Sequence, residues 1–523
     1  MSLIAQSYKT SRWNDFWWGI NLRTSSDAID DKQWTVGNNM SSEWNKLVTI
    51  PWYVEYYTPS SWVTKSQWIA LYSWKILTLH NRNLYLYDTA TWSLYTKANA
   101  VWNNSDTYSI LTTKSFSSGN ISIVIININV ATTEDIVAYE FDGSTFITKT
   151  FTSLTDKNFK CWAFYEWKLW LGWNPKFPSS LYTSRTWSVL NSWYIYDFSA
   201  YDSSSQNIWD GEPIVSVVTN HNELFVFKTN SIWRLNSTKD TWSIMAYIFK
   251  QETATWALNS RCVVPVEQDI IYFDWINIRR LSYEVNINSL NDDSISKEIN
   301  PIIESLPSSQ ASNATMYFVY PFVKLFLRDK FSINNSVAIV YNIVDKSFST
   351  QSWLEVIQWV WGFVNNKRTA YFITSQTSTI YQDNVWYTYN WGNIQFNHKS
   401  KRYVLWDWVD YKRISQVELY GSITPWLIVN IDIMVNGSLV DTRQISFNEY
   451  ILPTTWSSQF GDTLLWGNNE EDVPRTRDFV VRYEYFNDWR DFQFSVRWNW
   501  QWRFELHWLN LMYKSIKAYD IHN

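Results

Sequence analysis

Short apolar runs separated by polar turns fill the centre of the chain. Residues 221–235 read His-Asn-Glu-Leu-Phe-Val-Phe-Lys-Thr-Asn-Ser-Ile-Trp-Arg-Leu, and residues 266–282 follow the same plan of run, turn and second run ending in Arg-Leu. Leu224 and Val226 would face one side of an extended strand, and Phe225 and Phe227 the other. A strand that is apolar on both sides indicates burial between stacked sheets. The repeated hairpin predicts a repeat architecture.

The same pattern continues on both sides of this region, with little helical periodicity. Further strand-turn-strand signals are residues 75–79, 83–87, 122–130, 136–141, 145–151, 337–349, 369–375 and 378–382. Asp142-Gly143 is typical of a two-residue hairpin turn. Residues 283–312 are polar and predict a long loop with one short helical turn near 302–306, between Pro301 and Pro307. We therefore predict an all-β fold.

The pattern changes near residue 400, where a basic segment, residues 399–402, precedes longer strands. These strands are predicted at residues 413–420, 427–435, 479–485, 492–498, 503–508 and 511–516. Such a series is typical of a β-sandwich of the jelly-roll type. We predict an N-terminal arm and first strand over residues 1–50, a β-propeller over 51–398 and a C-terminal β-sandwich over 399–523, with few contacts across residue 400.

The composition is unusual in two residue types at once. The chain has 37 Trp and 12 Gly among 523 residues. Average usage of about 7% would give roughly 37 glycines. Trp stands where turns favour Gly, at Trp92, Trp173, Trp275, Trp391 and Trp408. Such positions often need a positive φ, which Gly adopts freely and a bulky residue does not.

We interpret this pattern as an alternative genetic code, in which UGA encodes glycine and the translation has written many such codons as Trp. The other interpretation is a genuinely Trp-rich protein, such as an aromatic sugar binder. If the code is alternative, the five tryptophans should lie in exposed turns, several with positive φ. If Trp is genuine, the indoles should be packed mid-strand with paired N–H groups.

Charge and cysteine usage exclude several classes of protein. The net charge of −5 gives no basic footprint for nucleic-acid binding. Cys161 and Cys262 lie far apart without metal spacing, which predicts two free thiols in the core. The N-terminus has no signal-peptide pattern. The longest apolar run, residues 121–130, is too short to span a bilayer. We expect a soluble protein made in a cytoplasm.

The sequence contains no readable catalytic, cofactor or metal motif, and we predict none of these sites. The histidines, His80, His221, His398, His507 and His522, lack partners at metal spacing. Residues 470–472 read Glu-Glu-Asp, which indicates a solvated turn or a weak Ca²⁺ site.

Other charged residues leave two functional alternatives open. Asp197, Asp202 and Asp210 are turn-capping residues or the carboxylates of a propeller glycosidase. The pairs Arg279-Arg280 and Lys401-Arg402 are solvated strand ends, or part of the lining of a DNA channel in an oligomer.

Several turn-and-strand motifs resemble those of tail β-propeller proteins of tailed bacteriophages. With Trp17, Trp18 and Trp173 taken as Gly, residues 17–25 become Gly-Gly-Gly-Ile-Asn-Leu-Arg-Thr-Ser, and residues 172–184 contain Gly-Asn-Pro-x-x-Pro-Ser-x-Leu-Tyr-x-Ser. Asn259-Ser260 matches a third motif loosely. The chain departs from the family at Ser26, where a Pro is usual, and at Ile50-Pro51, where an Arg is usual. The resemblance covers roughly residues 16–390.

The resemblance implies a structural virion protein of the tail, made in the host cytoplasm. It would act at the head–tail connection or the tail tip as a nozzle, adaptor or stopper. Copies would form a ring around the DNA-exit channel and contact portal or tail proteins, and DNA would pass without specific binding. No cofactor is implied. The alternatives are a propeller glycosidase or polysaccharide lyase acting on host envelope glycan, and a carbohydrate-binding tail module.

Overall fold

The computed structural model describes most of the chain outside its longest loops. The described residues are 9–13, 19–20, 33–43, 46–50, 54–58, 66–72, 75–80, 83–88, 94–98, 114–115, 122–130, 133–141, 146–154, 156–186, 195–199, 204–208, 211–241, 244–284, 289–306, 314–328, 335–352, 356, 358–364, 367–374, 377, 379–383, 396–400, 402–404, 410–423, 427–446, 477–484, 488–489, 491–498 and 504–517.

Within these ranges the protein is almost entirely β-structure in small antiparallel sheets, which confirms the predicted all-β class. The single α-helix of the described residues, α1 (Asn300–Glu304), confirms the short helical turn expected near 302–306, but it begins before Pro301 and includes it. A 3-10 helix covers Ser260–Cys262. No helix in the described part of the chain is both long and apolar enough to span a membrane.

The chain divides into two compact units. Unit 1 contains residues 1–52, 339–352 and 385–523, and unit 2 contains residues 53–338 and 353–384. The boundary expected at 398/399 falls inside β34 (Phe396–Ser400), whose backbone pairs with β41 (Asp491–Trp498). The N-terminal segment contributes strands to the sheets of unit 1. Its residues Met40, Leu47 and Val48 are buried there.

Unit 2 consists mainly of four-stranded antiparallel sheets whose strands follow in sequence order. These are β7–β10, β11–β14, β15–β18, β19–β22 and β23–β26; β27 pairs with β28, and the last sheet has the order β31-β32-β33-β6. The strands are β6 (Val54–Tyr57), β7 (Ser66–Tyr72), β8 (Lys75–His80), β9 (Asn83–Asp88), β10 (Leu94–Ala98), β11 (Lys114–Ser115), β12 (Ser122–Val130), β13 (Thr133–Phe141), β14 (Phe146–Lys149), β15 (Cys161–Tyr165), β16 (Lys168–Gly172), β17 (Ser180–Thr183), β18 (Ser204–Asn207), β19 (Ile214–Asn220), β20 (Glu223–Lys228), β21 (Ile232–Thr241), β22 (Ile244–Thr253), β23 (Val263–Val266), β24 (Asp269–Phe273), β25 (Ile278–Glu284), β26 (Ser289–Ser294), β27 (Thr315–Val319), β28 (Phe322–Arg328), β31 (Gln358–Val364), β32 (Lys367–Ile373) and β33 (Ile380–Asp383).

The strand β20 shows why the sheets stack. Leu224 and Val226 enter a core shared with the β15–β18 sheet, while Phe225 and Phe227 enter a core shared with the β23–β26 sheet. The expected burial on both faces is therefore confirmed. Strand β26 lies within residues 283–312, which were predicted as a loop. Its composition, Ser-Leu-Asn-Asp-Asp-Ser, is polar because it is the outer strand of its sheet.

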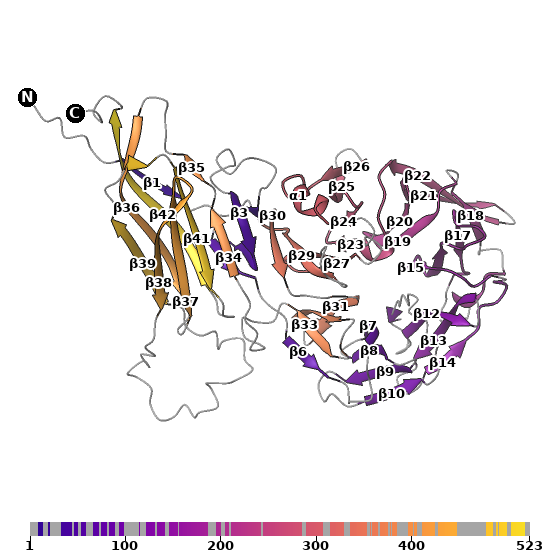
Figure 1. Ribbon diagram of the computed structural model, residues 1–523. Helices are drawn as coiled ribbons and strands as arrows, with labels where there is room; N and C mark the ends of the chain where they lie inside the picture. Colours follow the sequence, from indigo (N-terminus) through magenta and orange to yellow (C-terminus); the bar gives the residue numbers. More distant parts are fainter. Residues whose placement is uncertain are drawn as a thin grey trace, which may run out of the picture. The chain divides into compact units, whose positions relative to one another are not determined.

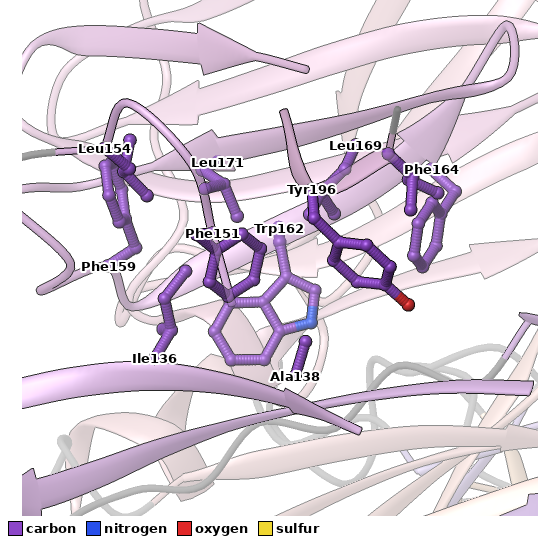
Figure 2. Close-up of a cluster of buried hydrophobic side chains, with 11 residues drawn as sticks. Ile136, Ala138, Phe151, Leu154, Phe159, Trp162, Phe164, Leu169, Leu171 and Tyr196 are labelled. Atoms are coloured by element: carbon purple, nitrogen blue, oxygen red, sulfur yellow. The ribbon is translucent and has the colours of Figure 1, made fainter. Parts of the chain in front are cut away.

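A third core joins the β11–β14 and β15–β18 sheets. Figure 2 shows the Trp162 indole of β15 close to Ile136 and Ala138 of β13, with the rings of Phe151 and Tyr196 beside it. The Tyr196 hydroxyl donates a 2.9 Å hydrogen bond to Glu140 at this interface. Apolar packing and a buried polar contact thus hold the same pair of sheets together.

The first strands of successive sheets contact one another in sequence order. β15 contacts β19, β19 contacts β23, β23 contacts β27, and β27 contacts β31 (Figure 1). β31 in turn contacts β7. The last sheet in the sequence therefore lies beside the first.

The N-terminal strand of unit 2 completes the last sheet. β6 pairs with β33 in antiparallel register, with Tyr57 opposite Ile380. The hydroxyl groups of Thr58 and Thr379 lie 3.0 Å apart, and the rings of Tyr56 and Tyr371 pack at 4.8 Å. Residues more than 300 positions apart are thereby held in one sheet.

A fully buried ion pair ties the β31–β33 sheet to β27 and β28. The Lys324 ammonium lies 2.8 Å from the Asp383 carboxylate, and the Tyr317 hydroxyl donates to the same carboxylate. Burial and the neighbouring carboxylate raise the pKa of Tyr317, so that its hydroxyl stays protonated and serves as a donor. All three groups are therefore satisfied away from water.

We predict that Lys324→Ala lowers the free energy of unfolding by about 3–5 kcal/mol, because Asp383 would be left as an unpaired buried charge. Urea denaturation followed by tryptophan fluorescence measures this loss. Lys176→Ala is the matched control: its ammonium is exposed and 3.7 Å from Asp156, so its removal should change stability by less than about 1 kcal/mol. Equal effects of the two substitutions would contradict the prediction.

Unit 1 contains strands from both ends of the chain. One sheet has the order β39-β36-β42-β5-β4, with β1 beside β42 and β40 beside β36; the other contains β30-β3-β34-β41-β37-β38, with β2 beside β3 and β35 beside β41. Strand β29 (Asn335–Asn342) crosses the division between the units. The other strands are β1 (Lys9–Trp13), β2 (Gly19–Ile20), β3 (Gln33–Asn38), β4 (Met40–Glu43), β5 (Lys46–Thr49), β30 (Ser347–Ser352), β35 (Tyr403–Val404), β36 (Asp410–Ile423), β37 (Ile428–Val435), β38 (Ser438–Ser446), β39 (Arg477–Glu484), β40 (Asp488–Trp489) and β42 (Phe504–Lys517).

Two expectations for this region need correction. The segments 503–508 and 511–516 form one strand, β42, which pairs with β36 along nearly its whole length. Strand β38 was not predicted, because it ends its sheet and its side chains are largely exposed. An edge strand with one partner has little of the apolar pattern on which strand prediction depends.

Among the residues that the structure describes, three tryptophans have a left-handed backbone conformation. Trp167, Trp173 and Trp275 have φ values of 61°, 58° and 82°. Trp167 is the second residue of a two-residue hairpin turn with positive φ at both positions, as is Gly437 in the turn between β37 and β38. Glycine is favoured at this turn position. Trp173 and Trp275 are half-buried rather than exposed as expected; Trp92, Trp391 and Trp408 lie outside the described residues.

Four other described tryptophans are buried, but they differ in whether the indole N–H has a hydrogen-bond partner. Trp170 is buried within β16 and donates its indole N–H to the Tyr165 carbonyl at 3.2 Å. Trp34, Trp162 and Trp498 are buried, but their indole N–H groups have no partner among the described residues. Trp170 is therefore the clearest genuine Trp.

We predict that Trp167→Gly stabilises the protein by about 1 kcal/mol, because it removes the steric cost of a left-handed Trp. In contrast, Trp170→Gly should cost at least about 3 kcal/mol by emptying a packed site. Thermal and urea denaturation of both variants measure these changes. A destabilising Trp167→Gly substitution, together with a tryptophan mass at this position in the native protein, would contradict the alternative-code interpretation.

Candidate functional site

A cavity of about 200 Å³ lies where the first strands of several sheets of unit 2 meet. Its lining comes from β15, β19, β23, β27 and β31 and from the 3-10 helix at Ser260. No single segment of the sequence supplies it. The cavity therefore depends on the order of the sheets.

The side chains around this cavity provide one positive charge and several neutral polar groups. Arg261 is the charged residue of the lining, accompanied by Ser216, Ser260 and Gln358. Burial raises the pKa of the Cys161 thiol far above its usual value, so this thiol is protonated at neutral pH and is a poor nucleophile. The lining offers groups for holding a small polar ligand.

A second cavity, of about 330 Å³, lies between the β19–β22 and β23–β26 sheets. Its floor is apolar, with Phe225, Ile270, Leu281 and Leu290 in the lining, and Glu223 and Gln268 are among its polar lining residues. An apolar interior with a few polar groups is the usual composition of a binding pocket, and this volume lies at the lower end of the usual range. We call this cavity the inter-sheet pocket.

Hydrogen bonds between two hairpin turns hold one side of the inter-sheet pocket. The Asn220 amide donates to the Asp269 carbonyl at 2.9 Å, and a ring nitrogen of His221 lies 3.1 Å from the Glu267 carbonyl. Glu223 in turn lies 3.0 Å from the buried Arg234 guanidinium, which also binds Glu252 at 2.9 Å. The pocket wall is thus fixed by contacts within the fold.

Asp197, one of the candidate carboxylates, supports a loop. It accepts hydrogen bonds from the Thr152 hydroxyl at 3.0 Å and from the backbone N–H of Ser199 at 2.9 Å, and it forms an ion pair with Arg185. Burial acts to raise the pKa of Asp197, but the hydrogen bonds from Ser199, Thr152 and Arg185 outweigh it and lower the pKa. This carboxylate is therefore an acceptor that remains ionised at neutral pH.

The Arg279-Arg280 pair is engaged within its own sheet. Arg279 binds Asp292 at 3.0 Å, and Asp292 also accepts from the Tyr272 and Thr255 hydroxyl groups. Arg280 lies 3.5 Å from Asp269. Both cations lie at the start of β25 and are ion-paired there, with side chains that are 18% and 33% exposed.

Asp274 caps the turn at Trp275 by accepting from the backbone N–H groups of Ile276 and Asn277. Burial raises the pKa of Asp274, although these bonds and Arg279 act in the opposite direction. Its geometry is that of a turn-stabilising Asp.

The described histidines have different environments. His221 lies in an exposed turn, and His507 lies 3.3 Å from the Ser422 hydroxyl. His398 is wholly buried in unit 1 against the rings of Trp34 and Phe494. His80 ends β8. No group of three possible metal ligands occurs within the described ranges.

The remaining candidates lie outside the described residues. They are Asp202, Asp210, Glu470, Glu471, Asp472, Lys401 and His522. Arg402 is described and half-buried. The two cavities were missed because each is assembled from strands far apart in the sequence. The one available signal was the repeat itself, since neighbouring hairpins place their turns together.

Buried His398 predicts a pH dependence of stability in unit 1. Burial lowers its pKa to about 3, so the unfolded state takes up a proton below about pH 6.5 while the folded state does not. The contribution of His398 to the free energy of unfolding is then complete above pH 6.5. It decreases as the pH is lowered, by about 2 kcal/mol at pH 5.

The measurement compares urea denaturation at pH 7 and pH 5 for the wild type and His398→Leu. We expect the variant to lose about 2 kcal/mol less than the wild type on acidification. The same substitution at exposed His221 is the control and should leave the wild-type pH dependence intact. An unchanged slope in His398→Leu would contradict the prediction.

Comparisons with known proteins give no family. No family model and no curated protein matches the chain. Among solved structures, Raptor from Chaetomium thermophilum is similar over 64% of this chain and 29% of its own, with 6% identity and a TM-score of 0.41. The extracellular domain of the one-component system BT4673 from B. thetaiotaomicron is similar over 63% of this chain and 39% of its own, with 12% identity and a TM-score of 0.36. The chain thus spans well under half of either structure.

Proposed function

We propose that this chain is a structural protein of a bacteriophage tail, with a seven-bladed β-propeller and a β-sandwich. The neighbour order of the first strands, which returns from β31 to β7, supports the propeller. The pairing of β6 with β33 supports closure of the ring of blades. Six four-stranded sheets and the β27–β28 hairpin account for seven blades.

Four residues of the motif that carries the resemblance have a clear physical role in the structure. The Asn174 side chain accepts from the Lys176 backbone N–H at 2.9 Å, and the Pro178 carbonyl accepts from Ile214 in the next sheet at 2.8 Å. Leu181 is buried in the core, and the Ser184 hydroxyl accepts from the Leu169 N–H. These contacts fix the connection between sheets.

The proposed role is mechanical. Copies would form a ring around the DNA-exit channel as a nozzle, adaptor or stopper, in contact with portal or other tail proteins. A net charge of −5 fits passage of DNA better than specific binding. The carboxylates Asp197 and Asp274 act as loop and turn acceptors, so the observations favour this role over a propeller glycosidase.

Purified virions test the proposal. We expect mass spectrometry to find the chain in the tail fraction, and electron microscopy of the recombinant protein to show closed rings. A monomer that is absent from virions and releases sugar from host envelope glycan would overturn the proposal in favour of the enzyme. Asp274→Asn is a useful control for that outcome, because a turn-capping Asp would not alter turnover.

A further inference from the structure

One exposed aromatic residue of this chain, Phe177, has chemistry that matches the apolar lining of the inter-sheet pocket. Phe177 is 55% exposed, which is the largest value among the large apolar side chains described in unit 2. It lies in the connection between β16 and β17, next to Lys176, whose side chain is 73% exposed. This pair presents a ring and a positive charge side by side.

The segment carrying Phe177 is held rigidly. The Phe177 backbone N–H donates to Asn174, and its carbonyl accepts from Ser180. Pro175 and Pro178 restrict the backbone on both sides. Because this conformation is already ordered, presenting the ring to a partner costs little additional entropy.

The inter-sheet pocket complements this segment in size and charge. An apolar cavity of about 150 Å³ can hold benzene, so about 330 Å³ leaves room for a phenyl ring and part of its backbone. The described lining contains one carboxylate, that of Glu223, which binds Arg234 at 3.0 Å within the fold and keeps a side chain that is 32% exposed. A Lys beside the entering ring would face this carboxylate.

We propose that Phe177 of one copy occupies the inter-sheet pocket of a second copy, with Lys176 beside Glu223. The two features belong to different sheets, so the contact is heterologous, and repeated heterologous contacts build rings or open filaments. In the proposed propeller, the connection between second and third strands and the turns between first and second strands lie on opposite faces. This contact rests on the proposed function, because it is a contact between copies of the propeller in the proposed ring.

Site-directed crosslinking tests the contact in the full-length protein. Phe177→Cys and Gln268→Cys are prepared as separate proteins, mixed in equal amounts and mildly oxidised. We expect a covalent heterodimer, because a disulfide requires the two Cα atoms within about 7 Å. The native thiols do not interfere: Cys161 and Cys262 are buried, and burial raises the pKa of Cys262 to about 12.

The matched control replaces Phe177→Cys with Ile147→Cys, which is exposed on another strand. Equal crosslinking of the control pair, or none in the test pair, would overturn the contact. In sedimentation experiments, Phe177→Ala should weaken self-association roughly ten- to a hundredfold, and Ile147→Ala should not. A wild-type protein that stays monomeric at all concentrations would also overturn it.

The two proposals can fail separately. Specific crosslinking without the chain in virions would keep the contact and reject the tail role. A chain found in virion tails without this crosslink would keep the tail role and reject the Phe177 contact.

Discussion

The pairing of β6 with β33 is the interaction on which the order of unit 2 depends. A row of stacked sheets leaves an apolar face exposed at each end, and neither end can be satisfied by polar residues alone. Here the first strand of the unit becomes the outer strand of its last sheet. Ile69 and Ile76 of the first sheet then pack with Tyr371, Ile373 and Ile380 of the last. The first and last sheets of the unit therefore share one core. In the proposed propeller, this contact closes the ring of sheets.

Several interfaces between sheets combine apolar packing with a small number of buried polar contacts. Lys168 donates to the Tyr247 hydroxyl at 2.7 Å, and Lys324 binds Asp383. Dispersion and burial supply most of the stabilisation but have little directionality. The buried polar pairs admit few alternative registers, because a shifted sheet would leave a charge without a partner. We infer that they select one arrangement among the packings that the apolar surfaces allow.

Much of the fold could be predicted from local pattern. Four consecutive apolar residues in β20 predicted that both faces of this strand are buried. The short helical turn near Pro301 was also predicted. The domain limits were harder, because β1 to β5 contribute to unit 1 through pairing with strands hundreds of residues away. β26 and β38 were missed since outer strands carry polar side chains. The cavities could not be predicted, because Phe225 and Leu281 become neighbours only when two sheets stack. Trp167 was overlooked as a turn residue, although its place after Glu166 between two apolar runs is a hairpin signal.

Hydrogen exchange on a Glu55→Pro variant tests the closure most directly, because proline interrupts β6 opposite Tyr381. If closure holds the sheets in order, amides of β31–β33 and of the β7–β10 sheet should lose protection together, while those of unit 1 keep it. Loss of protection confined to residues 54–58, with both sheets as protected as in the wild type, would contradict the account.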